Sequence, residues 1–178
     1  MEGVAAPVVL TVGHSTRTLD ALIGLLRRHG VELLADVRTI PRSRRHPHFA
    51  GDALRDSLPA AGIRYDHLEA LGGLRRSRPD SVNLAWQDAS FRGYADHMQT
   101  AGFEDGVARL LELARHERTA VMCAEAVPWR CHRSLLADAL VARGVPVAHI
   151  VGEGEAQPHR LTPWARVERG RVTYPALA

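Results

Sequence analysis

The segment 119–133, which reads TAVMCAEAVPWRCHR, gathers several side chains that can do chemistry. An apolar, strand-like run ends at Cys123, and a turn through Pro128 then leads into a helix-like stretch. The start of a helix presents free backbone N–H groups and the positive end of the helix dipole, which favour thiolates and bound anions. The reactive side chains of this segment are Cys123, Glu125, Arg130, Cys131, His132 and Arg133.

The two cysteines predict different chemistry. Cys131 precedes the expected helix and has basic neighbours on both sides, so its thiol pKa should be lowered and its thiolate favoured. Cys123 ends a buried strand and is either a second nucleophile or an inert buried thiol. A redox role would require the two residues to lie within disulfide geometry. We expect no metal site, because adjacent Cys131 and His132 rarely reach one ion and the chain has no CxxC or HxxxH pair. The cofactor stays unknown.

Two other expected strands also end in polar residues. The tripeptide GHS at 13–15 follows the apolar run 8–12, and DVR at 36–38 closes the run 31–37. Ligands of open α/β sheets bind beyond the carboxyl ends of the strands. These tripeptides should therefore meet the loop after Cys123 at one edge of the sheet.

The carboxylates at these strand ends allow both catalytic and structural interpretations. Glu125 and Asp36 are candidates for a general acid or base if burial raises their pKa. Alternatively, Glu125 is the ion-pair partner of Arg133 or Arg38, and Asp36 braces the loop by pairing with Arg38. The candidate catalytic residues are Glu125, Asp36, Cys131, Cys123 and His14. The candidate substrate-binding residues are Ser15, Arg38, Ser43, Tyr65, Arg92, Tyr94, Arg130, His132 and Arg133.

The loop 38–52, RTIPRSRRHPHFAGD, is the most basic part of the chain. Its arginines are either a solvated charged surface or part of an anion site. The arrival of Arg38 and Arg133 at the same sheet edge favours phosphate or another anion. Aromatic side chains near the basic loops either stack on bases or anchor the core.

The hydrophobic patterns predict alternating strands and helices. Strands are expected at 8–12, 31–37, 63–67, 120–123 and 146–151, and helices at 19–29, 52–61, 91–100, 103–117 and 132–143. The two helices around 102 should be broken at Gly102, 71–88 should be a long loop, and 159–175 should form an edge hairpin or lid. We therefore expect an α/β, Rossmann-like, three-layer fold with a mainly parallel sheet, organised as a single domain over 1–178.

The composition is that of an ordinary globular protein, with 46% hydrophobic and 24% charged residues in 178. The apolar runs are too short to cross a bilayer, and the N-terminus lacks the basic start of a signal peptide, so a cytoplasmic location is expected. The net charge is +3, and all of the 23 Lys and Arg residues are arginine.

Six pieces of the chain resemble one family, the prokaryotic proteins known as domain of unknown function 488. They are TVGHS at 11–15, DVRTIPRS at 36–43, LGG at 71–73, FRGYADHM at 91–98, CAEAVPWRCHR at 123–133, and the tail motifs HRLTPWARV and VTYP. The resemblance implies the fold and a shared site at these motifs. The cysteine loop also resembles rhodanese and protein-phosphatase loops, in which a thiolate sits within a ring of N–H groups, although six residues separate Cys123 from Arg130 here.

These observations predict a small enzyme, a hydrolase or transferase, that acts on an anionic, phosphate-containing substrate, such as one derived from a nucleotide or nucleic acid. Its pocket would lie at the carboxyl ends of the strands. The alternative is a non-catalytic nucleic-acid-binding or regulatory module that uses the arginine-rich loop. Expected partners are an anionic small molecule or a nucleic acid, with a homodimer as an open option and no membrane.

Overall fold

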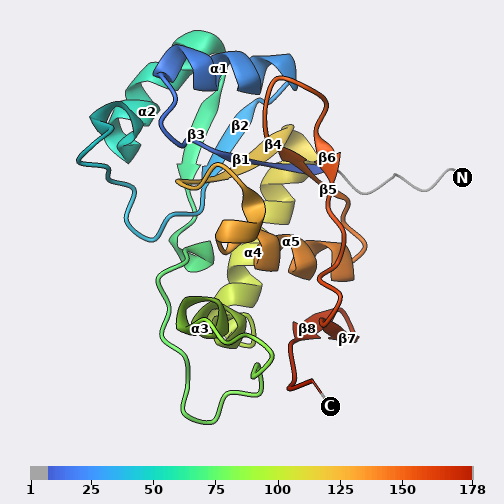
Figure 1. Ribbon diagram of the computed structural model, residues 1–178. Coiled ribbons are helices and arrows are strands. Elements are labelled where there is room, and N and C mark those ends of the chain that lie inside the picture. Colours follow the sequence, from blue (N-terminus) through green and yellow to red (C-terminus); the bar gives the residue numbers. More distant parts are fainter. Residues whose placement is uncertain (1–7, 178) are drawn as a thin grey trace, which may run out of the picture.

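The computed structural model describes residues 8–177, so Ala178 and the stretch 1–7, part of the region assessed for a signal peptide, lie outside it. The described chain forms a six-stranded sheet in the order β3-β2-β4-β1-β5-β6 (Figure 1). Its strands are β1 (Val9–Gly13), β2 (Leu33–Asp36), β3 (Arg64–His67), β4 (Thr119–Cys123), β5 (Val147–Ile150) and β6 (Gln157–Pro158). The first five are parallel, and β6 is antiparallel to β5.

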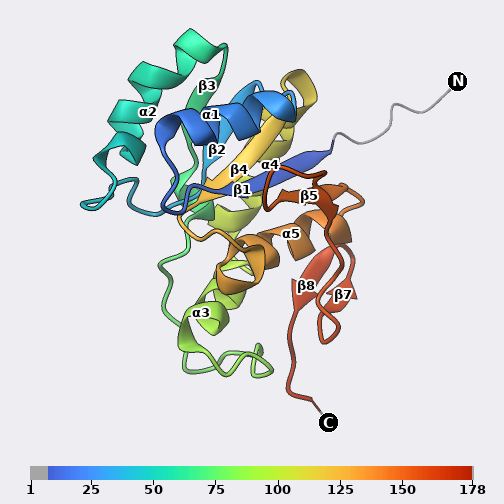
Figure 2. The same ribbon diagram turned by 45° about the horizontal axis from the view of Figure 1, so that its top comes forward.

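Helices cover both faces of this sheet, which confirms the predicted α/β fold. The helices are α1 (Leu19–Arg28), α2 (Gly51–Ser57), α3 (Ala89–His97), α4 (Ala101–His116) and α5 (Arg133–Ala142). Figures 1 and 2 show α1 and α2 on one side of the sheet and α4 and α5 on the other. No helix within residues 8–177 is long and apolar enough to cross a membrane.

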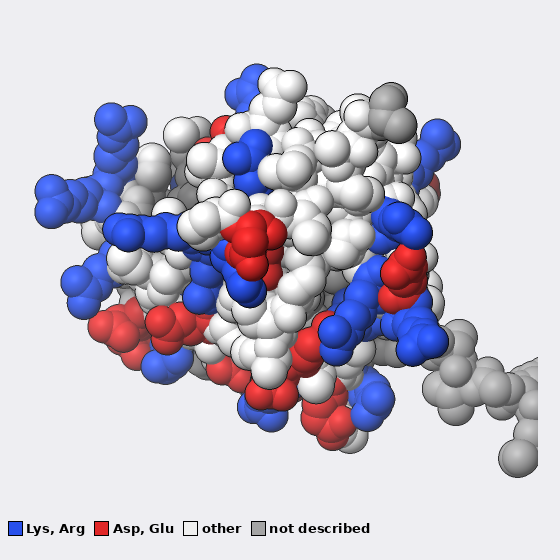
Figure 3. Space-filling model, turned by 90° about the horizontal axis from the view of Figure 1, so that it is seen from below, with Lys and Arg blue, Asp and Glu red and all other residues white. Residues whose placement is uncertain are grey.

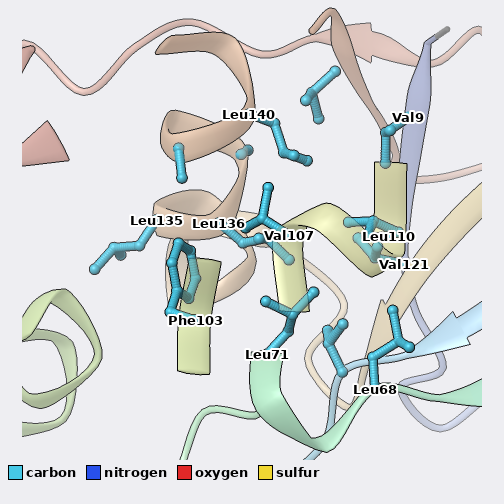
Figure 4. Close-up of a cluster of buried hydrophobic side chains, with 14 of the residues drawn as sticks. Val9, Leu68, Leu71, Phe103, Val107, Leu110, Val121, Leu135, Leu136 and Leu140 are labelled. Carbon is cyan, nitrogen blue, oxygen red and sulfur yellow. The ribbon is translucent and has the colours of Figure 1, made fainter. Parts of the chain in front are cut away.

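Two apolar clusters hold these layers together. Neighbouring strand residues point to opposite faces, so Val9 and Val121 join the cluster under α3, α4 and α5, whereas Leu10 and Met122 join the cluster under α1 and α2. Figure 4 shows the first cluster, in which Leu140 of α5 lies near side chains of α4 and the strands. The nearly continuous apolar strands predicted from the sequence are therefore covered on both faces, as expected for parallel sheets.

Most of the predicted elements are confirmed, with differences at their ends. Thr18 caps α1 by accepting a hydrogen bond from the Ala21 amide, so the helix begins where predicted. The predicted break at Gly102 is wrong, because Thr100 accepts from the Phe103 amide and caps α4, which places Gly102 inside the helix. The predicted helix 52–61 is α2 followed by a 3-10 turn (Leu58–Ala61). No helix or strand interrupts residues 72–88, as predicted for a long loop.

The predicted C-terminal hairpin consists of β7 (Arg166–Glu168) and β8 (Arg171–Thr173). Its turn residues Arg169 and Gly170 both have positive φ, of 51° and 77°. After the hairpin, the buried Tyr174 donates a hydrogen bond of 2.7 Å to the Asp138 carboxylate. This contact fastens the hairpin to α5. The two-residue strand β6 was not predicted, because two residues are too few to carry a pattern.

Candidate active site

The three polar strand ends lie side by side, as the sequence predicts. In the parallel register Gly13 of β1 is opposite Cys123 of β4, and Asp36 of β2 is opposite Met122. The His14 amide then donates to the Cys123 carbonyl at 3.0 Å, which keeps the two chains together beyond the sheet. Gly13 is required here, because a Cβ at this position would lie 1.6 Å from the carbonyl oxygen of Glu125.

A cavity of about 550 Å³ opens above these strand ends. Its lining combines the strand ends, the basic loop, the loop after β3, the start of α3 and the approach to α5. The lining residues are His14, Arg38, Thr39, Ile40, Arg42, Ser43, Gly73, Leu74, Asp88, Ser90, Phe91, Cys123, Ala124, Glu125, Arg130, Cys131 and His132.

The two cysteines face one another at the floor of this cavity. Their sulfur atoms are 2.7 Å apart, and both are free thiols. Burial raises the pKa of Cys123, and the adjacent Cys131 sulfur raises it further, so Cys123 stays protonated and donates to Cys131. Burial also opposes ionisation of Cys131, but hydrogen bonds from Cys123 and His132 and the charges of His132 and Arg133 outweigh it. The pKa of Cys131 therefore lies well below its usual value, as predicted.

Arg133 follows Cys131 by two residues and is fully buried. Its guanidinium donates to Thr11 Oγ1 at 3.1 Å and to the Glu125 carbonyl at 2.8 Å, while its Nε has no hydrogen-bond partner. The backbone amide of Arg133 donates to Cys131 Sγ at 3.3 Å. Within residues 8–177 no carboxylate lies within ion-pair distance of Arg133. The charge of Arg133 is one of the causes that lower the pKa of Cys131, so the thiolate compensates part of this buried charge.

A chain of hydrogen bonds connects Arg133 to a distant carboxylate. Thr11 Oγ1 bonds to His149 Nδ1 at 2.6 Å, His149 Nε2 bonds to His159 Nδ1 at 2.8 Å, and His159 Nε2 donates to Asp138 at 2.7 Å. The last direction is fixed because the carboxylate only accepts. Burial, with the charges of His159 and Arg133, lowers the pKa of His149 to about 3. His149 therefore relays between Arg133 and His159 without carrying charge at neutral pH.

Asp36 has the bracing arrangement rather than an open carboxylate. It is fully buried, and both of its oxygens accept from the Arg38 guanidinium, the closest contact being 2.6 Å. The Tyr65 hydroxyl donates to the same carboxylate at 2.6 Å. Burial and the Asp36 charge raise the pKa of Tyr65. Asp36 thus fixes Arg38 at the cavity wall. Tyr65 does not line the cavity and contacts the site through Asp36.

Two other catalytic candidates line the cavity directly. His14 is buried, and its Nδ1 donates to the Ser15 carbonyl at 2.9 Å, which leaves Nε2 as an acceptor. Burial lowers the pKa of His14, and the nearby Arg38 charge lowers it further, against the effect of the Ser15 hydrogen bond. The Glu125 side chain is exposed in the cavity and forms no ion pair in the described chain, so the predicted pairing with Arg133 or Arg38 is absent.

The predicted binding residues divide into those at the cavity and those behind it. Those lining it are Arg38, Ser43, Arg130 and His132, whereas Ser15, Tyr65, Arg92, Tyr94 and Arg133 do not line it. His132 donates to the Val37 carbonyl at 2.8 Å and packs at 4.9 Å on the ring of the buried Tyr94. Arg92 donates instead to the Trp86 carbonyl. Tyr94 and Arg92 therefore support the site from outside the cavity.

Sequence reasoning did not identify several lining residues as part of the site. They are Thr39, Ile40, Gly73, Leu74, Asp88, Ser90, Phe91 and Ala124. The sequence signal for Gly73 was its place in the LGG motif. The structure explains the glycine, because a Cβ there would lie 2.4 Å from His132 Nδ1. Asp88 carried a second signal, because an aspartate before a helix is a common cap. Its side chain accepts from the Ser90 and Phe91 amides at the start of α3. Within residues 8–177 no cluster of three or more His, Cys, Asp or Glu side chains is placed to hold a metal ion.

Comparison with known families agrees with these motifs. The model of a family described as domain of unknown function DUF488 matches residues 18–140. The chain belongs to this family. The DUF488 match begins at the cap of α1 and ends in α5, so it includes the ends of β2 and β4 and both cysteines. Neither the curated proteins nor the solved structures give a match to the chain.

Proposed function

We propose that the protein is a thiol-dependent group-transfer enzyme that acts on a small anionic substrate bound in the cavity. The observation that carries this proposal is the position of Cys131. Cys131 lines the cavity and precedes helix α5, and its sulfur accepts from the backbone amide of Arg133, a buried arginine with no carboxylate within ion-pair distance in the described chain. These are the surroundings that favour a nucleophilic thiolate near neutral pH.

The other groups around the cavity have complementary roles in this proposal. Arg42 and Arg130 are exposed at the rim and form no ion pair in the described chain, so their charges are available to an anion. Glu125 and Asp88 are exposed carboxylates of the cavity, and Glu125 would transfer protons to or from the substrate. Asp88 contributes less, because its side chain already caps α3. The substrate would form a covalent intermediate on Cys131 and then be transferred to water or another acceptor.

Alkylation with matched reagents tests this proposal. We expect Cys131 to react at a pH of about 7, below the ordinary cysteine pKa of about 8.5. Iodoacetate carries a carboxylate, whereas iodoacetamide is neutral. Arg130→Ala should therefore slow labelling by iodoacetate several-fold and change labelling by iodoacetamide little. The labelled residue would be identified by mass spectrometry.

The matched control is Arg27→Ala, which removes an exposed arginine of α1 outside the cavity. This variant should react with both reagents like the wild type. Labelling of Cys123 in place of Cys131, or labelling that begins only above the ordinary thiol pKa, would rule out the proposed nucleophile. Equal slowing of both reagents by Arg130→Ala would rule out a role of that charge in anion binding.

A second candidate function is nucleic-acid binding by the basic loop. Arg42, Arg44 and Arg45 are exposed and have no ion-pair partner in the described chain. This arrangement suits phosphate contacts that need no catalytic group. The two candidates differ in what Cys131 contributes, because a binding module would not depend on its thiolate.

A further inference from the structure

We infer that Cys123 is a resolving thiol, so that the two cysteines form a redox pair which reduces an anionic, low-molecular-mass disulfide. This inference rests on the proposed role of Cys131 as the nucleophile. It adds an oxidoreductase step and a substrate class to that role.

The distance between the two sulfur atoms is the first support. At 2.7 Å the Cys123 and Cys131 sulfurs are already in contact across the floor of the cavity. Cys123 ends β4, and Cys131 follows a 3-10 turn (Pro128–Arg130) and precedes α5 by two residues, so the contact joins the strand to the loop that enters the helix. A group attached to Cys131 would therefore lie within direct reach of a second thiol.

The protonation of the pair suits a two-step exchange. Cys131 is the thiolate, which is the attacking form, and its low pKa also makes it a good leaving group. Cys123 keeps its proton because burial raises its pKa, so it is held in reserve until Cys131 has reacted. Once Cys131 carries a substituent and no charge, the repulsion that opposes ionisation of Cys123 disappears.

The exchange balances without a further reactant. The Cys131 thiolate attacks one sulfur of a disulfide R–S–S–R, which forms a mixed disulfide and releases one thiolate R–S⁻. The Cys123 thiol then loses its proton and attacks the Cys131 sulfur of the mixed disulfide. This step forms the Cys123–Cys131 bond and releases the second R–S⁻, which takes up the proton from Cys123. The substrate gains two electrons, the cysteine pair loses two, and an external dithiol reduces the pair again.

The cavity favours a small disulfide that carries negative charge. Its volume of about 550 Å³ is in the range of small-molecule sites, and both cysteines are among its lining residues. Arg42 and Arg130 lie at its rim with no ion-pair partner in the described chain. Carboxylate groups on the substrate would match these guanidinium groups.

Two chromogenic disulfides test the inference. 5,5′-Dithiobis(2-nitrobenzoate) is a dicarboxylate, and 2,2′-dithiodipyridine is its neutral counterpart. From the first probe, the reduced full-length wild type should release two thionitrobenzoates per chain and end without a bound aryl group. Cys123→Ser should release one and keep a mixed disulfide on Cys131, visible as added mass. Dithiothreitol should restore the free thiols of the wild type.

The variants separate failure of this inference from failure of the proposed function. If Cys123→Ser and the wild type both stop at the mixed disulfide, Cys131 remains the nucleophile but Cys123 is not a resolving thiol. If Cys131→Ser reacts as fast as the wild type, both proposals are overturned. Arg130→Ala should slow the reaction with the dicarboxylate probe several-fold and the reaction with the neutral probe little. If the substitution slows both reactions by the same factor, the anionic substrate class is overturned. Circular dichroism of each variant, with Cys123→Ala as a second substitution, would identify effects of misfolding.

Discussion

Arg133 is a cation with no access to solvent and no carboxylate within ion-pair distance in the described chain, and its charge helps to lower the pKa of Cys131. Cys131→Ser should therefore leave a buried charge without compensation and lower the free energy of unfolding by roughly 3 kcal/mol. Arg133→Met removes that charge, so the double variant should be more stable than the sum of the single effects by about 1–3 kcal/mol. Urea unfolding of the four proteins would measure this coupling.

The coupling should depend on pH in a defined direction. The folded-state pKa of Cys131 lies below its unfolded value, so the stabilisation is fully present above an unfolded thiol pKa of about 8.5 and is lost as the pH falls through the folded value. The matching control cycle pairs Cys131→Ser with Arg143→Met at the other end of α5, which should be additive. Additive effects of Cys131→Ser and Arg133→Met at every pH would contradict the charge pairing.

At the level of single residues, the sequence predicts neighbours along the chain better than partners across the fold. The pairing of Asp36 with Arg38 was one of two open interpretations, because the residues are two positions apart and both follow one strand. The contact of Arg133 with Thr11 spans 122 positions, and no local pattern specifies it. The sequence also did not predict that Arg133, expected to bind substrate, is buried. Burial depends on the packing of elements that are distant along the chain.

Helix α5 links the cavity to the edge of the sheet through the hydrogen-bonded series from Arg133 to Asp138. His149 in the middle of this series has a pKa of about 3 because it is buried, whereas it should titrate near 6.5 when unfolded. Between these values the unfolded chain binds a proton that the folded chain does not. The burial of neutral His149 therefore costs no stability above a pH of about 6.5. As the pH falls below that value, it lowers the free energy of unfolding by about 1.4 kcal/mol per pH unit.

His149→Gln should remove this contribution. We expect the free energy of unfolding of the variant to fall less steeply between a pH of about 6 and 4 than that of the wild type, by close to one proton. The slope is the measured quantity, because the substitution also changes hydrogen bonds and shifts stability at every pH. His116→Gln on the exposed face of α4 is the control and should keep the wild-type slope. An unchanged slope in His149→Gln would contradict the neutral relay.

Over the whole molecule, the parallel order of the strands explains why the architecture and the meeting of the polar strand ends at one edge were predictable. Apolar runs separated by helices allow few topologies, and a parallel sheet brings the polar ends of its strands to one edge. The cavity also uses residues from the loop after β3 and the start of α3, such as Leu74 and Ser90. These residues have no distinctive chemistry in the sequence. They reach the cavity only because the long irregular loop before α3 folds over the sheet.

The distribution of charge over the molecule bears on the second candidate function. On the face seen in Figure 3, basic groups are interspersed with acidic ones, so this face does not present a continuous basic surface. A nucleic acid would then depend on the loop that carries Arg42, Arg44 and Arg45. Arg44→Ala combined with Arg45→Ala should weaken binding of a single-stranded oligonucleotide and reduce the salt dependence, by a slope of roughly 0.7 for each phosphate that the variant no longer neutralises.

Filter binding over a salt series would measure these slopes, with Arg27→Ala as the matched arginine control and Cys131→Ser as the test of the thiol. A binding module predicts that Cys131→Ser binds like the wild type and that the loop variant has a shallower slope. A thiol enzyme for small anions predicts little binding by any of the proteins and no effect of the loop variant on the neutral disulfide probe. Strong binding that the loop variant retains would exclude the basic loop as the nucleic-acid contact, because its arginines supply the only charges that this candidate assigns to phosphate.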